Sequence, residues 1–157
     1  MVNNFASKSR ISTISQIGPR GTLLNSKNNE TNTLFSKEFH LECFNKIKIY
    51  LSTHNYDHEF TKKILTSISD KEFRELFKFL ISKSRPEWNY ELTKIDEHLP
   101  LLLTEIRYPY SLVKAYLKAI STPGALGQIL KVLAWLVEIN NASEIVFIYF
   151  NLNLNFI

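Results

Sequence analysis

The pattern of apolar and polar positions predicts an all-α chain organised around one buried helix. Between Leu126 and Ile139, apolar residues occupy positions 126, 129, 130, 132, 133, 135, 136, 137 and 139. A helix that is apolar on nearly every side must lie inside a domain. Thr122 and Pro123 precede it as an N-cap residue and a proline at the first helical position, so they predict where it begins.

This central segment does not predict a membrane span. A span needs about 20 consecutive, predominantly apolar residues. Gly127, Gln128 and Lys131 interrupt the apolar run well before that length is reached. We therefore expect no membrane partner, and we expect the other helices to pack around this one.

Two amphipathic helices are predicted before the central one. The first runs from an N-cap at Ser36 to about Thr53, and its apolar face holds Phe39, Cys43, Ile47, Tyr50 and Leu51. A capping box, Ser69 at the N-cap and Glu72 three residues later, opens the second, which runs to about Ser84. Its core face holds Phe73, Leu76, Phe77, Leu80 and Ile81.

The remaining segments have weaker patterns. Residues 60–68 form a short apolar piece, residues 91–106 predict a helix interrupted or kinked near Pro100, and residues 111–119 predict short turns. Tyr108-Pro109-Tyr110 is expected to be an extended aromatic turn that closes the core. Residues 145–157 begin with a run of six apolar residues and then alternate Asn with Leu and Phe. This pattern favours a strand or a disordered segment that is prone to aggregation.

The first 33 residues are rich in Ser, Thr and Asn and show no apolar periodicity, so we expect them to be disordered. The pattern thus divides the chain into three parts. These are a disordered basic arm over 1–33, a helical domain over 34–140 and an apolar tail over 141–157.

The net charge of +4 lies entirely in the arm and its junction. Residues 1–37 hold one acidic residue, Glu30, and five basic ones, Lys8, Arg10, Arg20, Lys27 and Lys37, whereas the rest of the chain is balanced at 14 basic and 14 acidic residues. A basic arm on a neutral domain usually meets an acidic partner, and a solubilising leader without a partner is the alternative. Ser12 and Thr22 follow arginines in R-x-[ST] patterns, and phosphate on either would weaken an electrostatic contact.

Motifs for catalysis, metals or nucleic acids are missing from the sequence. One cysteine, Cys43, allows no disulfide framework, which with the lack of a leader pattern favours a reduced intracellular compartment. His54 and His58 are four residues apart but lack further ligands, so we expect no metal and no cofactor. An enzyme would require a pocket that gathers these histidines with Asp57. The charge balance after residue 37 offers no basic recognition helix, so no nucleic-acid partner is expected.

A family resemblance rests on the segments YPYSLVKAYL and VLAWLVE together with a series of spaced positions. These positions are Leu34, Lys37, Tyr56, His58, Lys63, Lys71, Phe73, Phe77, Phe79, Leu80, Pro86, Pro100, Tyr108-Pro109-Tyr110, Lys114 and Ala134-Trp135-Leu136. In this order and spacing, residues 34–138 resemble the calponin-homology head of the HEC/NDC-eighty kinetochore protein family. The resemblance implies a calponin-homology-like fold and a nuclear location at the kinetochore of the centromere.

The resemblance also implies binding to spindle microtubules during chromosome segregation. The family uses a lysine-rich face and its arm to bind the microtubule lattice and the acidic tubulin tails, and Aurora-type kinases weaken attachment by phosphorylating the arm. Lys37, Lys63, Lys71 and Lys114 match the lysine face, and Lys8, Arg10, Arg20 and Lys27 supply the arm. Leu101, Thr104 and Gly124 stand where the family carries basic residues or a histidine.

The resemblance ends before the coiled coil that pairs the family with a NUF-two-type subunit. No heptads follow residue 139, so the chain as given is expected to be a fragment, a truncated gene model or a stand-alone head that does not form the family's rod. A generic calponin-homology module that binds actin, or another cytoskeletal interaction module, is the alternative function.

Overall fold

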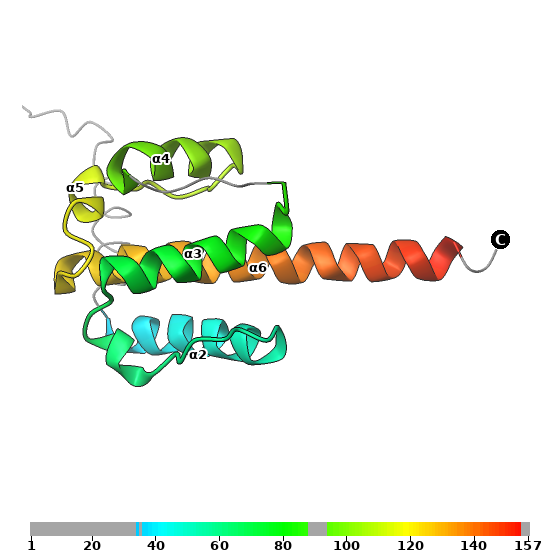
Figure 1. Ribbon diagram of the computed structural model, residues 1–157, viewed down its shortest axis with the longest axis horizontal. Helices are drawn as coiled ribbons and strands as arrows, with labels where there is room; N and C mark the ends of the chain where they lie inside the picture. Colours follow the sequence, from blue (N-terminus) through cyan, green and yellow to red (C-terminus); the bar gives the residue numbers. More distant parts are fainter. Residues whose placement is uncertain (1–33, 35, 88–93, 155–157) are drawn as a thin grey trace, which may run out of the picture.

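The computed structural model describes residues 34, 36–87 and 94–154, and the regular elements in these ranges are all helical (Figure 1). In chain order they are α2 (Lys37–Thr53), the 3-10 helix η1 (Lys62–Leu65), α3 (Asp70–Ser84), α4 (Ile95–Glu105), α5 (Lys114–Leu117) and α6 (Pro123–Leu154). The predicted all-α, calponin-homology-like class is confirmed. The arm predicted over residues 1–33 lies outside the described residues.

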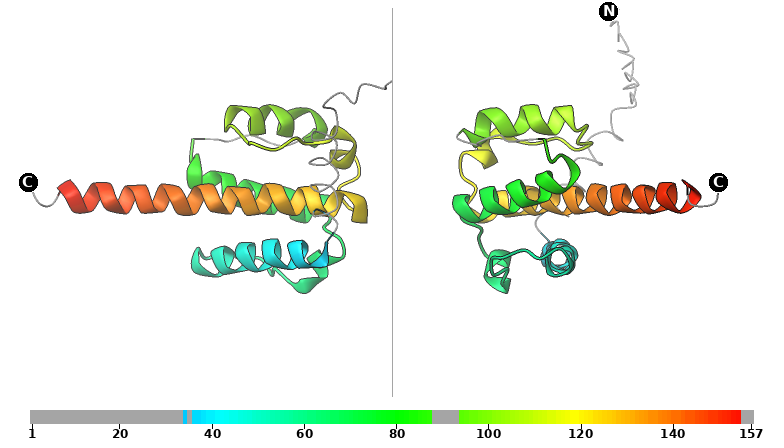
Figure 2. Two further views of the ribbon diagram at one scale, coloured as in Figure 1. Left: turned by 180° about the vertical axis from the view of Figure 1, so that it is seen from behind. Right: turned by 45° about the vertical axis from the view of Figure 1, so that its right-hand side comes forward.

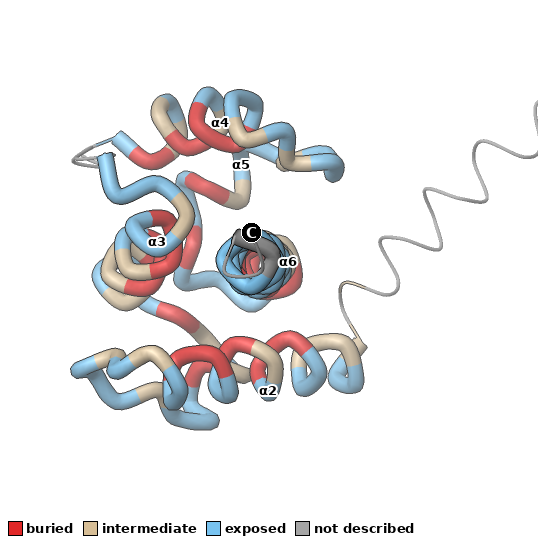
Figure 3. Tube along the Cα trace, turned by 90° about the vertical axis from the view of Figure 1, so that its right-hand side faces the viewer, coloured by how far each residue is buried: buried red, intermediate tan, exposed pale blue. Residues whose placement is uncertain are grey.

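The first half of α6 is the centre of the domain. Both α2 and α3 pack along it, and α5 packs near its start. Figure 3, which looks along α6, shows α2, α3 and α4 arranged around it. Its most deeply buried apolar residues form one broad face of the helix: Ala125, Leu126, Ile129, Leu130, Val132, Leu133, Leu136 and Val137. On the remaining side, Glu138 is the one exposed residue between positions 125 and 140. The buried central helix is therefore confirmed.

The start of α6 follows the predicted pattern in part. Pro123 is the first helical residue, as expected. The hydroxyl of Thr122, however, donates to the carbonyl of Ala119 at 2.7 Å and thereby closes the preceding turn. The proline, whose fixed φ suits the first helical turn, marks this helix start.

The two flanking helices begin where the sequence predicted. The hydroxyl of Ser36 accepts from the backbone N–H of Phe39 at 3.3 Å, and Ser69 and Glu72 make both bonds of the capping box, at 3.2 and 2.8 Å. All five residues predicted for the core face of α3 are buried. On α2, Phe39 is only partly buried, and the enclosed residues are Cys43, Phe44, Ile47, Tyr50 and Leu51.

The region before α6 agrees with the prediction, except that the helix is not interrupted at Pro100 and that Tyr110 does not close the core. This proline lies inside α4, which continues without interruption from Ile95 to Glu105; residues 91–93 lie outside the described part. Tyr108 packs edge-on against Trp135, with ring centroids 4.9 Å apart, and so helps to close the core. Tyr110 is 40% exposed, and the ammonium group of Lys131 lies 3.6 Å from its ring centroid.

The prediction of a strand or disorder for residues 145–157 is wrong for the described part, because α6 continues to Leu154. We name residues 141–154 the projecting segment, because they extend past the ends of α2 and α3 in every ribbon view (Figures 1 and 2). The run of β-branched and aromatic residues favours a strand only weakly, and a helix already formed within the domain is extended at little cost. Seven large apolar side chains of this segment are more than half exposed: Ile145, Val146, Phe147, Ile148, Tyr149, Phe150 and Leu152.

Over Pro123–Leu152, α6 is also long and apolar enough to cross a membrane, judged by length and composition alone. The central helix of a globular domain passes the same test, and the first half of α6 is such a helix. The projecting segment spans about 21 Å at 1.5 Å per residue, which is shorter than the hydrocarbon core of about 30 Å. The geometry thus favours a core helix that extends beyond its domain.

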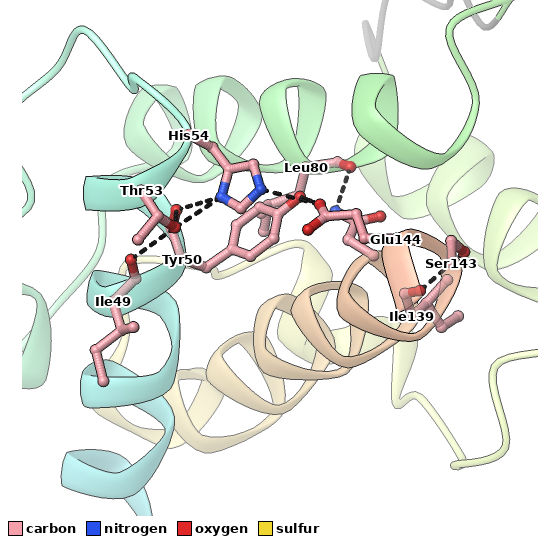
Figure 4. Close-up of polar contacts among 9 residues, drawn as sticks. Ile49, Tyr50, Thr53, His54, Leu80, Ile139, Ser143 and Glu144 are labelled. Carbon is pink, nitrogen blue, oxygen red and sulfur yellow. Dashed lines mark hydrogen bonds and ion pairs between the residues drawn. The ribbon is translucent and has the colours of Figure 1, made fainter. Parts of the chain in front are cut away.

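A polar cluster lies where α6 leaves the domain (Figure 4). The buried amide of Asn140 donates to the carbonyl of Leu80 on α3 at 2.9 Å. One turn further along, the carboxylate of Glu144 accepts from the hydroxyl of Tyr50 at 3.1 Å and lies 2.9 Å from Nε2 of His54. These bonds join α6 to α2 and α3 at the base of the projecting segment.

Candidate functional site

The four lysines carried over from the family resemblance lie toward one end of the domain, which we name the lysine end. Lys37 is the first residue of α2, Lys71 the second of α3 and Lys114 the first of α5, while Lys63 lies in η1. All four are exposed. Figure 1 shows that α2, α3 and α6 run in the same direction and that η1 and α5 lie near their starting ends. Aligned helix starts also place partial positive charge at this end.

Acidic residues in the first turns at this end are engaged by their own helices. The hydroxyl of Ser36 donates to the carboxylate of Glu38 at 2.6 Å, and this bond is the main cause that lowers the pKa of Glu38. Bonds from the hydroxyl and the backbone N–H of Ser69 lower the pKa of Glu72, and the charge of Lys63 contributes a smaller effect. These carboxylates are therefore held within the starts of their own helices.

The cations of the lysine end are mostly unpaired. Lys71 lies 3.9 Å from Glu75, but its side chain is 86% exposed, so the pair is weak. Asp70 is held by Arg74 on the same helix at 2.6 Å. Within the described ranges, no ion pair involves the other three lysines, Lys37, Lys63 and Lys114. Their charges are available to an acidic partner.

The junction between the arm and the domain lies against the first turns of α6. A Cβ atom on Gly127 would lie 2.0 Å from the carbonyl oxygen of Leu34, so only glycine permits this close approach. The ring of His40 donates from Nε2 to the same carbonyl at 2.6 Å. Since α6 starts at the lysine end, the chain enters the domain near that end. Sequence reasoning missed this junction, because its only signal was one glycine in an apolar helix.

The arm residues themselves lie outside the described residues. These are the basic residues Lys8, Arg10, Arg20 and Lys27 and the candidate phosphosites Ser12 and Thr22. Two positions that depart from the family pattern are described on α4: Leu101 is 69% exposed, and Thr104 is exposed with its hydroxyl bonded to the carbonyl of Pro100. The structure thus places apolar and neutral groups on the α4 surface where the resemblance implies cations.

The histidines do not form a site with Asp57. His54 stacks on Tyr50, with ring centroids 3.8 Å apart, and bonds to Glu144, while the ring of His58 contacts Tyr56 edge-on. No group of three or more His, Cys, Asp or Glu side chains in the described residues could hold a metal ion. Burial raises the pKa of the Cys43 thiol to about 11, which disfavours the nucleophilic thiolate.

Comparison with known proteins places these features in a family. A model of the HEC/Ndc80p family matches residues 38–147, from the first turn of α2 into the projecting segment. The chain is 30% identical over 124 residues to the chicken (Gallus gallus) "Kinetochore protein NDC80 homolog", covering 79% of this chain and 19% of the relative. It is 28% identical over 105 residues to the Xenopus laevis homolog, covering 67% of this chain and 16% of the relative.

A fungal relative gives the same result. The "Probable kinetochore protein NDC80" of Cryptococcus neoformans is 31% identical over 113 residues, which cover 71% of this chain and 16% of the relative. The aligned regions thus span less than one fifth of the length of these curated relatives. Because the family model matches most of the chain, the resemblance drawn from the sequence is confirmed, and the chain belongs to the HEC/Ndc80p family.

Proposed function

We propose that this protein acts at the kinetochore, at the centromere of chromosomes in the nucleus, and binds spindle microtubules during chromosome segregation. Family membership supports the location, because the relatives are named kinetochore proteins. The observation that carries the microtubule proposal is the lysine end, where four exposed lysines accompany the aligned starts of α2, α3 and α6. A binding role without catalysis fits this surface.

The proposed interaction is electrostatic. The microtubule lattice and the tubulin tails are acidic, and lysine ammonium groups on flexible stems suit a diffuse anionic surface. The basic arm joins the domain at Leu34, against the first turns of α6, so it can reach the same partner as Lys37 and Lys114. Phosphorylation of Ser12 or Thr22 would remove between one and two charges from the arm and weaken this contact.

Cosedimentation with taxol-stabilised microtubules tests the proposal. The full chain should bind less as salt rises and after proteolytic removal of the tubulin tails, because the attraction is screened and partly deleted. Reversing one charge with Lys114→Glu should weaken binding by about tenfold, equivalent to about 1.4 kcal/mol.

Lys83→Glu is the matched control, because Lys83 lies in the last turn of α3, away from the lysine end. This variant should bind nearly as well as the unmodified chain. Equal losses for the two variants, or binding that does not respond to salt, would contradict the proposed surface. Pelleting with actin filaments in place of microtubules would favour the generic calponin-homology module.

The projecting segment supports a second part of the proposal, a NUF-two-type partner subunit. One face of this segment carries Ala142, Ser143, Val146, Phe147 and Phe150, and the side chains of Val146, Phe147 and Phe150 are more than half exposed. Exposed apolar surface of this extent typically marks a protein interface. Coexpression with a NUF-two-type subunit should give a complex that Phe147→Lys disrupts and Lys83→Glu leaves intact. A complex that survives Phe147→Lys would place the subunit elsewhere.

A further inference from the structure

A short exposed turn joins α5 to α6 at the lysine end (Figure 1). Its residues Ser121, Thr122 and Pro123 are exposed, whereas Ile120 before them and Ala125 after them are buried. The turn is therefore a surface segment that the core holds at both ends.

Thr122 combines a hydroxyl group with a following proline, which is the pattern that proline-directed serine/threonine kinases modify. Of the five prolines in the sequence, Pro123 is the one that directly follows a serine or a threonine. The same pair of residues can start a helix, with the threonine as its N-cap. In the structure, however, the hydroxyl of Thr122 donates to the carbonyl of Ala119 at 2.7 Å. The threonine thus closes the preceding turn, and the proline starts α6.

The hydrogen bonds that hold this turn are local. The backbone N–H and the hydroxyl of Thr122 both donate to the carbonyl of Ala119, at 3.0 and 2.7 Å, and the N–H of Ala125 donates to the carbonyl of Thr122 at 3.0 Å. A kinase binds its substrate as an extended segment, so these bonds must open first. Exposed bonds at a helix end open at a low cost in free energy, so the kinase can reach Thr122 while the core stays folded.

The surroundings of Thr122 are basic. Between Glu105 and Glu138, every charged residue in the sequence is a cation: Arg107, Lys114, Lys118 and Lys131. The helix α5, which begins with Lys114, packs on the start of α6, and a Cβ atom on Gly124 would lie 3.7 Å from the ring of Tyr116. Lys114 is therefore close to this turn in the fold as well as in the sequence. A negative charge on Thr122 would be added directly to the lysine end.

We propose that Thr122 is a phosphorylation site of a proline-directed kinase and that phosphate there releases the lysine end from microtubules. The release step rests on the function proposed above. In the transfer, Oγ1 of Thr122 bonds to the γ-phosphorus of ATP, ADP leaves with the electron pair of the broken bond, and the hydroxyl proton passes to the catalytic carboxylate of the kinase. The phosphate carries about −1.5 to −2 charges at pH 7, so it offsets up to about half of the charge of the four lysines.

The same phosphate should stabilise the domain. It would lie at the start of α6, where the first N–H groups of the helix have no partner within the helix and the helix dipole favours negative charge. Phosphorylation should therefore raise the unfolding temperature while it weakens binding to microtubules. These opposite effects distinguish a charge switch from a loss of binding caused by unfolding.

Treatment of the full chain with ATP and two proline-directed kinases, one cyclin-dependent and one mitogen-activated, tests the modification site. Mass spectrometry should locate phosphate on Thr122 with at least one of the two kinases. Pro123→Ala keeps the threonine and suits a helix start, and it should lower the yield at least tenfold. Ser12 and Thr22 are not followed by proline and should remain unmodified. If neither kinase modifies Thr122, or if Pro123→Ala is modified equally well, the inference is overturned.

Cosedimentation and thermal unfolding of the phosphorylated chain test the release step. At low salt, the phosphorylated chain should bind microtubules about tenfold more weakly than the untreated chain, and it should unfold at a higher temperature. Treatment with a phosphatase should reverse both changes. Undiminished binding after complete modification would overturn the release step. If the untreated chain binds no microtubules, the function proposed above and the release step both fail, while the yield of phosphate still decides the modification site.

Discussion

The two halves of α6 have similar apolar character but opposite surroundings. The first half is enclosed by α2, α3 and α5, and Ile129, Leu130 and Leu133 are completely buried. The projecting segment carries a run of six apolar residues, Ile145 to Phe150, that are all more than half exposed. The boundary between the halves is marked by the bonds of Asn140 to α3 and of Glu144 to α2.

This difference shows that apolar composition alone does not tell a core helix from an interaction helix. The first half acquires its role from the helices that pack on it, whereas the large apolar side chains of the projecting segment beyond Glu144 are more than half exposed. The molecule therefore has two unlike ends. The lysine end, where α6 starts, suits an acidic partner, and the projecting segment suits an apolar one.

The largest expected effect comes from truncating a core residue of the first half. Leu133→Ala removes a completely buried side chain, so it should lower the free energy of unfolding by about 2–5 kcal/mol. Urea denaturation followed by circular dichroism measures this change. Leu133→Met keeps the volume and should cost less than about 1.5 kcal/mol. A cost below 1 kcal/mol for Leu133→Ala would show that the first half is loosely packed.

The next effect concerns the close approach at the start of α6. Gly127→Ala would place a methyl group 2.0 Å from the backbone oxygen of Leu34, and backbone moves less easily than a side chain. We expect a loss of about 1–3 kcal/mol in thermal unfolding experiments. Gly124→Ala is the control, because its Cβ would lie 3.7 Å from Tyr116, and it should be neutral or stabilising. Equal stability of both variants would mean that Leu34 does not pack on α6.

Local sequence signals were sufficient for the elements whose causes are local. The capping box of Ser69 and Glu72 fixes the start of α3. The apolar spacing of the segment correctly predicted the five residues that α3 buries. The helical state of residues 145–154 was missed, because their β-branched and aromatic side chains favour a strand locally. The first half of α6, which is stabilised by tertiary packing, extends into them as a helix.

Some features of the candidate site could be predicted from the sequence, whereas others could not. Lys37, Lys63, Lys71 and Lys114 could be proposed only because they match positions in the family pattern. The contact between Gly127 and Leu34 joins residues 93 positions apart, and no local pattern encodes it.

A smaller effect is expected at the boundary between the two halves. Tyr50→Phe removes the hydroxyl that donates to Glu144, which should cost about 1 kcal/mol at pH 7. Burial, and then the charge of Glu144, raises the pKa of Tyr50 above its ordinary value of about 10. The unfolded chain therefore releases this proton first, so stability should fall as pH rises above about 10.

Unfolding free energies measured between pH 8 and pH 11 test this expectation. The decline above pH 10 should be smaller in Tyr50→Phe, because one of the tyrosines with a raised pKa has been removed. Burial likewise raises the pKa of Tyr56, to about 12, so part of the decline should remain. An identical decline in both proteins would mean that Tyr50 ionises freely and that the boundary cluster does not hold α6.

The smallest effect is expected from the same chemical change placed in the projecting segment. Leu152→Ala removes a side chain that is 55% exposed, so it should change the free energy of unfolding of the isolated chain by no more than about 0.5 kcal/mol. Its comparison with Leu133→Ala isolates the surroundings, because both substitutions are made on one helix. A cost near that of Leu133→Ala, especially one that grows with protein concentration, would show that other copies of the chain cover this segment. A negligible cost leaves the segment's apolar surface available to a partner subunit.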